Sequence, residues 1–125
     1  MNHNKLVIKG GKRLSGIHTV SGNKNAALPM IAASLLATEP VTLTNVPDIT
    51  DVDCMIKAAT KFGAKVSRDA KAGILKIHAP KLKSAKIDAS VAAQIRTSVL
   101  FAGPLLARAG RASIPPPGGD DIGHR

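Results

Sequence analysis

The sequence has almost no aromatic residues and a single cysteine, and each scarcity excludes a class of protein. It contains no tryptophan and no tyrosine, and its only phenylalanines are Phe62 and Phe101. Proteins that hold single-stranded nucleic acid stack the bases on aromatic rings, so this composition argues against that class. Cys54 has no second cysteine to pair with, which excludes an internal disulfide. Because no motif surrounds Cys54, we interpret it as a small apolar residue on a helix.

Acidic residues and long apolar runs are also scarce. The 8 acidic residues oppose 18 basic ones, and the formal net charge is +10. Such a balance favours anionic partners: phosphorylated small molecules, nucleic acid or an acidic membrane surface. Apart from the run Lys81–Lys86 the basic residues are scattered, so nucleic acid is the weaker alternative. The longest apolar stretch, 26–37, is shorter than the ~20 residues of a membrane-spanning helix, and residues 1–5 do not lead into a signal peptide. We therefore expect a soluble cytoplasmic protein.

What the sequence does contain predicts an α/β protein. The 125 residues, 44% of them apolar, are enough for one domain with a core. Residues 26–37 predict a helix that is apolar on every side and therefore buried. Apolar residues from Val52 to Phe62 recur at helical spacing, and Gly63 is a natural end for that amphipathic helix. Short strands are predicted at 6–8, 17–20, 41–46, 64–68 and 74–79, the last two forming a hairpin.

A second unit begins near Ile87 with the same order of elements, a short strand and then a helix. Ser90 is the predicted cap of a long helix that runs to Leu106, with a kink or split at Gly103-Pro104 and an end at Gly110. A last short strand is predicted at 112–114. From residue 17 onward, the order strand, helix, strand, helix, strand, strand thus starts to repeat.

The stretch Ser21–Pro29 places a cation where a helix begins. Gly22 allows the backbone to bend where a side chain would clash, Asn23 or Asn25 can cap the helix, and Pro29 lies early enough to be tolerated in its first turn. A helix start offers unpaired N–H groups to an anion, and Lys24 adds a full positive charge there. From the residues alone, a solvated lysine on an ordinary turn is the favoured interpretation.

Ser21–Pro29, continued by Ala32-Ala33-Ser34-Leu35-Leu36-Ala37-Thr38-Glu39-Pro40-Val41-Thr42-Leu43-Thr44-Asn45-Val46-Pro47, resembles the N-terminal signature of the UDP-N-acetylglucosamine 1-carboxyvinyltransferases. The resemblance implies repeated βαβαββ units of an inside-out α/β barrel, with helices inside and sheets outside. Family members are several times longer and have two domains. We therefore expect a fragment, in which residues 1–20 give strands to a second domain and 21–125 begin the enolpyruvyl transferase domain, truncated in its catalytic loop.

The resemblance also implies an activity. These enzymes transfer the enolpyruvyl group of phosphoenolpyruvate to the 3′-hydroxyl of UDP-N-acetylglucosamine and release phosphate, the first committed step of peptidoglycan synthesis. The implied partners are these two substrates, with no cofactor, metal, nucleic acid or membrane, and we expect the isolated chain to be inactive. One alternative is the shikimate-pathway enolpyruvyl transferase, which has Ser-Lys-Ser where this chain has Asn23-Lys24-Asn25. Another is a small basic nucleic-acid-binding module.

The resemblance assigns roles to individual residues. Lys24 matches the lysine that contacts phosphoenolpyruvate, and Asn25 matches the neighbour that faces the sugar nucleotide. Arg96 matches an arginine near the substrates, and Arg125 matches the substrate-binding arginine after the catalytic loop. A guanidinium offers a fork of donors that fits phosphate or carboxylate.

The predicted catalytic loop is 117–125, and its glycines suit a closing lid. Asp120 stands where most family members carry a cysteine that acts as an acid, so Asp120 is the predicted catalytic residue. Its carboxyl can donate a proton if burial or the neighbouring Asp121 raises its pKa. Fosfomycin alkylates the family's cysteine, and a carboxylate is a much poorer nucleophile than a thiolate. We therefore expect resistance to fosfomycin.

Overall fold

The computed structural model describes residues 6–94, 96–116 and 118. It contains a three-stranded antiparallel sheet in the order β1-β3-β2, formed by β1 (Val41–Leu43), β2 (Lys65–Asp69) and β3 (Ile74–His78). In the central strand, Ile77 pairs with Val41 on one side and with Val66 on the other. The predicted hairpin is therefore confirmed, and β1 is shorter than the predicted strand.

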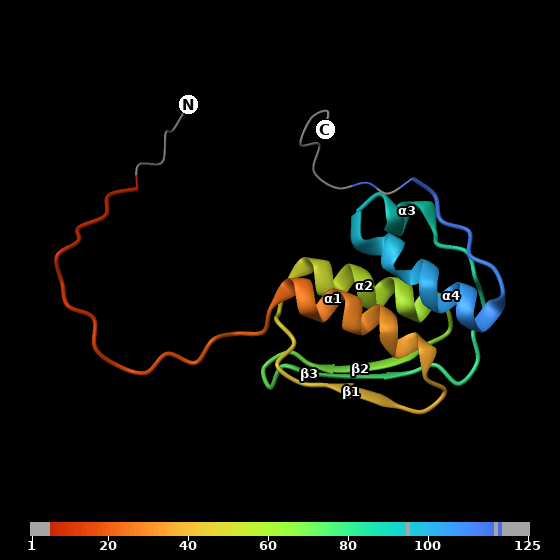
Figure 1. The fold of residues 1–125 in the computed structure, drawn as a ribbon, viewed down its shortest axis with the longest axis horizontal. Coiled ribbons are helices and arrows are strands. Elements are labelled where there is room, and N and C mark those ends of the chain that lie inside the picture. Colours follow the sequence, from red (N-terminus) through yellow and green to blue (C-terminus); the bar gives the residue numbers. More distant parts are fainter. Residues whose placement is uncertain (1–5, 95, 117, 119–125) are drawn as a thin grey trace.

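Two helices cover one face of this sheet (Figure 1). They are α1 (Lys24–Ala33), which the short 3₁₀ helix η1 (Ser34–Leu36) extends, and α2 (Thr50–Lys61). Leu75 and Ile77 of β3 are buried, whereas Lys76 between them is exposed, as expected for a strand with one covered face. The amphipathic pattern predicted for α2 is confirmed, because its apolar residues are buried: Val52, Cys54, Met55, Ala58 and Ala59.

The long helix predicted to follow Ser90 is instead three short helices. They are α3 (Ala89–Ala92), the 3₁₀ helix η2 (Arg96–Phe101) and α4 (Ala102–Ala109). The cap of α3 is Asp88, whose carboxylate accepts a hydrogen bond from the Ser90 backbone. The split lies before Gly103-Pro104, since α4 starts at residue 102 and Pro104 falls in its first turn, where a missing N–H is tolerated. Gly110 ends α4 with a left-handed φ of 68°, as predicted.

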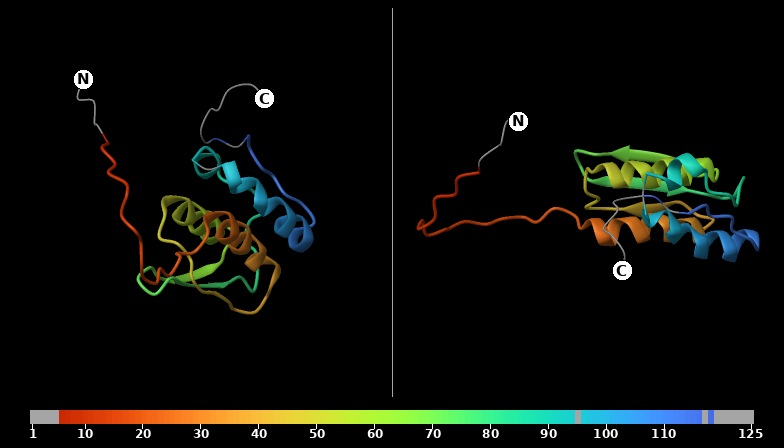
Figure 2. Two further views of the ribbon diagram at one scale, coloured as in Figure 1. Left: turned by 60° about the vertical axis from the view of Figure 1, so that its left-hand side comes forward. Right: turned by 90° about the horizontal axis from the view of Figure 1, so that it is seen from above.

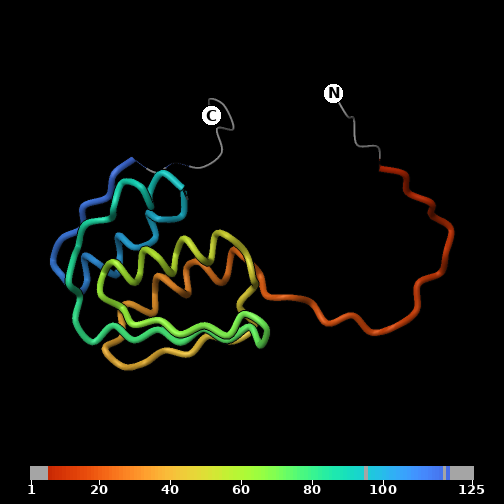
Figure 3. Tube along the Cα trace, turned by 180° about the vertical axis from the view of Figure 1, so that it is seen from behind, coloured from red at the N-terminus to blue at the C-terminus, as the bar shows by residue number. Residues whose placement is uncertain are grey.

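Four predicted short strands do not form. Residues 6–20 contain no strand and run as an exposed extended segment toward α1 (Figures 1 and 3). The strands expected near Ile87 and at 112–114 are reduced to one parallel bridge between Lys86 and Ser113. A strand exists only where a neighbouring strand accepts its hydrogen bonds, and residues 6–20 have no such neighbour in the described part of the chain. The assignment of residues 1–20 to a second domain stays a prediction.

The prediction that α1 is buried on every side is wrong. Ala27, Leu28, Ile31 and Ala32 are buried, but Met30 is 45% exposed. The helix packs against α2 and η2 and leaves its other residues exposed, and α4 lies on the same side of the molecule as α1 (Figure 2). No helix of the described residues is long and apolar enough to cross a membrane.

Candidate functional site

The first turn of α1 is capped by an asparagine, as the sequence predicts. Asn23 has an extended backbone, its side-chain oxygen accepts a hydrogen bond of 3.2 Å from the Ala26 N–H, and its carbonyl accepts one of 3.0 Å from the Ala27 N–H. Pro29 lies in the second turn rather than the first. The helix tolerates it because the carbonyl that its N–H would have reached belongs to Asn25, an exposed residue.

Gly22 is required at its position because two backbone segments approach each other there. A Cβ atom on Gly22 would lie 1.7 Å from the carbonyl oxygen of Asn45. Asn45 itself has a left-handed φ of 55°, and the next N–H, that of Val46, donates a 2.9 Å hydrogen bond to the carbonyl of Gly73 in the hairpin turn. The start of α1 is therefore fixed against the loop after β1, which is fixed against the turn between β2 and β3.

Lys24 is the first residue of α1, and its ammonium is held by the neighbouring helix. Its Nζ lies 2.7 Å from a carboxylate oxygen of Asp51, in the first turn of α2, and both side chains are partly exposed at 55% and 36%. Exposed ion pairs of this kind contribute only about 0–1 kcal/mol, so an anionic ligand can compete with Asp51 for the ammonium. Asn25 is exposed beside Lys24.

Asp51 was missed by the sequence analysis as a partner for Lys24, because the two residues are far apart in the chain. The turn that carries it is also tied down from the sheet side. Arg68 of β2 is only 18% exposed, donates a 2.8 Å hydrogen bond to Asp48 and pairs with Asp53. The acidic first turn of α2 is thus a fixed feature beside the start of α1.

Arg96 is the exposed first residue of η2, and η2 packs against α1. The chain returns to this region near its end, where the N–H of Gly118 donates a 2.8 Å hydrogen bond to the carbonyl of Ala92. A Cβ on Gly118 would lie 1.9 Å from the carbonyl oxygen of Ala93, so the contact requires glycine. The predicted catalytic loop thus has one described residue beside the segment that leads to Arg96. The predicted Asp120 and Arg125 lie outside the described residues.

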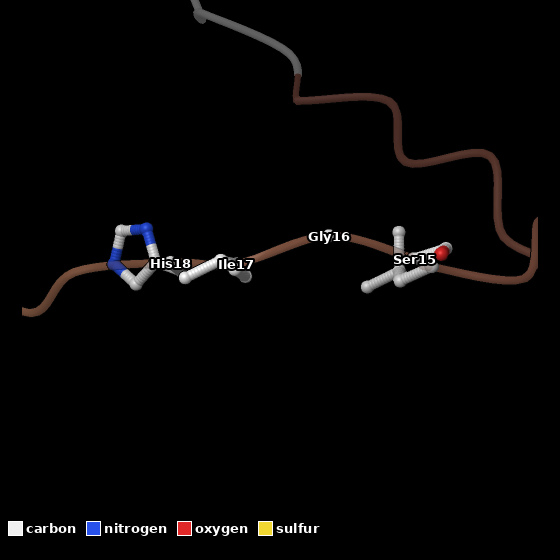
Figure 4. Close-up of a pocket in the computed structure, with 5 residues that line it drawn as sticks. Ser15, Gly16, Ile17 and His18 are labelled. Carbon is white, nitrogen blue, oxygen red and sulfur yellow. The ribbon is translucent and has the colours of Figure 1, made fainter.

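Other features in the described part of the chain do not form a site. A hollow of about 320 Å³ lies along the extended segment, and its lining is five consecutive residues, 14–18. Figure 4 shows that Ser15, Gly16, Ile17 and His18 of this lining follow one another along the extended segment, and no helix or strand of the described residues lies opposite them. Among the described residues, no group of His, Cys, Asp or Glu side chains could hold a metal ion.

Comparison with known proteins places the chain in a family. Residues 8–125 match the family model for EPSP synthase (3-phosphoshikimate 1-carboxyvinyltransferase), so the chain belongs to this family. It is 49% identical, over 97% of its length, to a UDP-N-acetylglucosamine 1-carboxyvinyltransferase of Bradyrhizobium diazoefficiens. It is 47% identical, again over 97% of its length, to the enzyme of that name from Treponema denticola. In each case the chain spans 28% of the relative's length.

The fold has a counterpart among solved structures. The enolpyruvyl transferase NikO from Streptomyces tendae superimposes with a TM-score of 0.67 at 28% identity, over 78% of this chain and 22% of that one. The resemblance to UDP-N-acetylglucosamine 1-carboxyvinyltransferases and the α/β fold of an enolpyruvyl transferase, both expected from the sequence, are therefore confirmed. The role of each candidate residue stays a prediction.

Proposed function

We propose that this chain forms the first part of an enzyme that transfers the enolpyruvyl group of phosphoenolpyruvate to the 3′-hydroxyl of UDP-N-acetylglucosamine, releasing phosphate at the first committed step of peptidoglycan synthesis. Two relatives named for UDP-N-acetylglucosamine, 49% and 47% identical, support this activity. The observation that carries the proposal is Lys24, whose ammonium is held by Asp51 at the capped start of α1, the helix against which η2 packs.

The arrangement suits two anionic substrates. The unpaired N–H groups and partial positive charge of the α1 start attract the phosphate or carboxylate of phosphoenolpyruvate, and Lys24 leaves Asp51 to meet it. Arg96 supplies a second cation from η2, and its fork of donors can hold a phosphate or carboxylate in one orientation. Asn25, exposed on the same first turn as Lys24, faces the sugar nucleotide in this proposal.

The chemistry needs an acid as well as cations. The reaction adds the sugar hydroxyl to the enol carbon while the methylene carbon is protonated, and the later loss of a proton and of phosphate restores the double bond. Asp120 is proposed as the proton donor, and Arg125 as a further contact to substrate. A carboxylic acid stays protonated near neutral pH only if burial or a neighbouring negative charge raises its pKa.

The alternative acceptor is 3-phosphoshikimate, which the name of the family model contains. The run Asn23-Lys24-Asn25 favours the sugar nucleotide as acceptor. The shikimate-pathway enolpyruvyl transferases, the alternative considered from the sequence, have Ser-Lys-Ser at that position. The two relatives described above carry the sugar nucleotide in their names as well. Acceptor choice is therefore the sharpest test between the two.

The test uses a chimera in which residues 1–125 replace the matching 28% of the Bradyrhizobium enzyme. Phosphate release from phosphoenolpyruvate is measured with UDP-N-acetylglucosamine and with 3-phosphoshikimate. We expect turnover with the sugar nucleotide only, and none from the 125-residue chain by itself. Turnover with 3-phosphoshikimate, or a folded but inactive chimera beside an active parent enzyme, would contradict the proposal.

Fosfomycin tests the position of Asp120 in the same chimera. A thiolate opens the epoxide of the drug, whereas the Asp120 carboxylate is a poor nucleophile, so the chimera should survive incubation and dilution with full activity. Asp120→Cys should restore time-dependent inactivation and add the mass of the drug to the loop peptide. A covalent adduct with loss of activity in the unsubstituted chimera would show that Asp120 does not occupy the family cysteine's position.

A further inference from the structure

A basic hollow lies at the end of the molecule opposite the start of α1. It is formed where the segment after β3 runs beside the segment after α4, at the parallel bridge between Lys86 and Ser113 (Figure 1). Its volume is about 370 Å³, within the range of ~300–1,000 Å³ of small-molecule sites. The residues that line it are Lys83, Ser84, Ala85, Lys86, Arg111 and Ser113.

The backbone around this hollow is held in place. The N–H of Ser113 donates to the carbonyl of Ala85 and the N–H of Ile87 donates to the carbonyl of Ser113, both at 2.9 Å. The N–H of Lys83 donates a 2.8 Å hydrogen bond to the carbonyl of Phe62, at the end of α2. The stem of Lys83 crosses Gly63, where an added Cβ would lie 2.8 Å from the Lys83 Cγ atom. The cations therefore extend from a fixed frame.

The charge of the hollow is not balanced by the protein groups that line it. None of its described lining residues is acidic. An adjoining hollow of about 560 Å³ shares Ser84 and Lys86 and brings in Lys61 and Asp88. The Asp88 carboxylate is already engaged, because it accepts hydrogen bonds from Lys61 at 2.7 Å and from Ser90. These bonds, that from Lys61 foremost, hold the pKa of Asp88 well below its usual range.

We propose that this hollow binds an anion with two linked phosphate groups. Lys83, Lys86 and Arg111 supply three positive charges from two chain segments, whereas one phosphate group carries only about two negative charges at neutral pH. A diphosphate matches that charge and can accept a hydrogen bond from the hydroxyl of Ser113. The hydroxyl of Ser84 already donates to the carbonyl of Lys86 at 3.3 Å. The site is independent of the proposed enolpyruvyl transfer, because its lining contains none of the residues proposed for that activity.

Titration of the 125-residue chain with pyrophosphate at physiological salt, followed by calorimetry, tests this site. We expect one saturable event, and Lys86→Gln or Arg111→Gln should each weaken it about tenfold, the loss of one charge-assisted contact. Lys71→Gln removes the same charge from the turn between β2 and β3, and this control should change the affinity less than twofold. Circular dichroism of each variant checks that its fold is unchanged.

Several results would overturn the site. They are an absence of saturable binding, equal weakening by Lys71→Gln and Lys86→Gln, loss of binding with Lys24→Gln alone, or orthophosphate binding as tightly as pyrophosphate. UDP separates the two sources of a diphosphate. Displacement of bound pyrophosphate by UDP would support a nucleotide ligand, and UDP without effect would support the free anion. Neither result depends on catalysis, so failure of this site and failure of the proposed function are distinguishable.

Discussion

The strand β3 and the segment 6–8 have similar apolar residues and opposite fates. In β3, Leu75 and Ile77 are 0% and 1% exposed, whereas Leu6 and Ile8 are 84% and 82% exposed. The difference is the presence of partners, because β3 pairs with strands on both of its edges and helices cover its face. An apolar pattern gives a segment only a tendency to form a strand. The strand forms where neighbouring strands share its hydrogen bonds and helices cover its apolar side chains.

Truncating one isoleucine from each region should give the largest contrast. Ile77→Ala leaves a cavity under α1 and α2 and should lower the free energy of unfolding by about 2–5 kcal/mol. Ile8→Ala removes the same atoms from an exposed side chain and should change it by less than about 0.5 kcal/mol. Urea denaturation of both variants measures the difference. Equal losses would mean that the segment 6–8 is packed in solution.

Gly22 and Gly10 allow the same comparison between a packed and an exposed region for the backbone. Gly22→Ala places a methyl group against the Asn45 carbonyl and should lower the free energy of unfolding by about 1–3 kcal/mol. Gly10 has nothing within 4 Å of its added Cβ and an ordinary φ, so Gly10→Ala should be nearly neutral. Thermal unfolding of Gly22→Ala and Gly10→Ala measures this difference in stability. A neutral Gly22→Ala would show that the contact between Gly22 and Asn45 is not maintained.

The pH dependence of stability should test the ion pair between Asp88, the cap of α3, and Lys61 of α2. The pKa of Asp88 is held below its ordinary value of 3.8 by Lys61 and Ser90, so its stabilising effect is complete above that pH and is lost as the pH falls further. Asp88→Asn keeps an acceptor for the Ser90 N–H but removes the charge. The free energy of unfolding of this variant should therefore fall less steeply below pH 4 than that of the parent, while Asp69→Asn in the hairpin serves as a control. Identical pH slopes for parent and Asp88→Asn would refute the pairing.

The smallest effect is expected inside η2. Ser98 is completely buried, and its hydroxyl has no hydrogen-bond partner among the described residues. Because a buried unpaired hydroxyl is unfavourable, Ser98→Ala should leave the free energy of unfolding unchanged or raise it by up to about 1 kcal/mol. A clear loss of stability in chemical denaturation would show that the hydroxyl has a partner in solution.

The sequence predicted those parts of the fold that depend on local pattern. The buried face of α2 follows from helical spacing, and the ends of α2 and α4 follow from Gly63 and Gly110, both with left-handed φ. The cap of α3 was misplaced because Asp88 and Ser90, two residues apart, are both good capping residues.

Features that depend on contacts between distant residues could not be predicted. The pair between Lys24 and Asp51 joins the starts of two helices, and the backbone that Gly22 meets, at Asn45, lies more than twenty residues away in the chain. In the same way, the exposed side of α1 reflects which elements happen to cover it. The candidate site was therefore located by residue type and resemblance, and its geometry came from the structure.

The most direct test of the account measures kcat/KM for phosphoenolpyruvate in the chimera after Lys24→Gln. Lys24 is proposed to hold a substrate anion, so kcat/KM should fall by about a hundredfold or more. Asp51→Asn breaks the same ion pair and should reduce kcat/KM far less, which separates substrate binding from support of the helix start. Lys71→Gln should leave it unchanged. If Lys24→Gln kept the parent value, or fell only as far as Asp51→Asn, the start of α1 would not be the site of phosphoenolpyruvate.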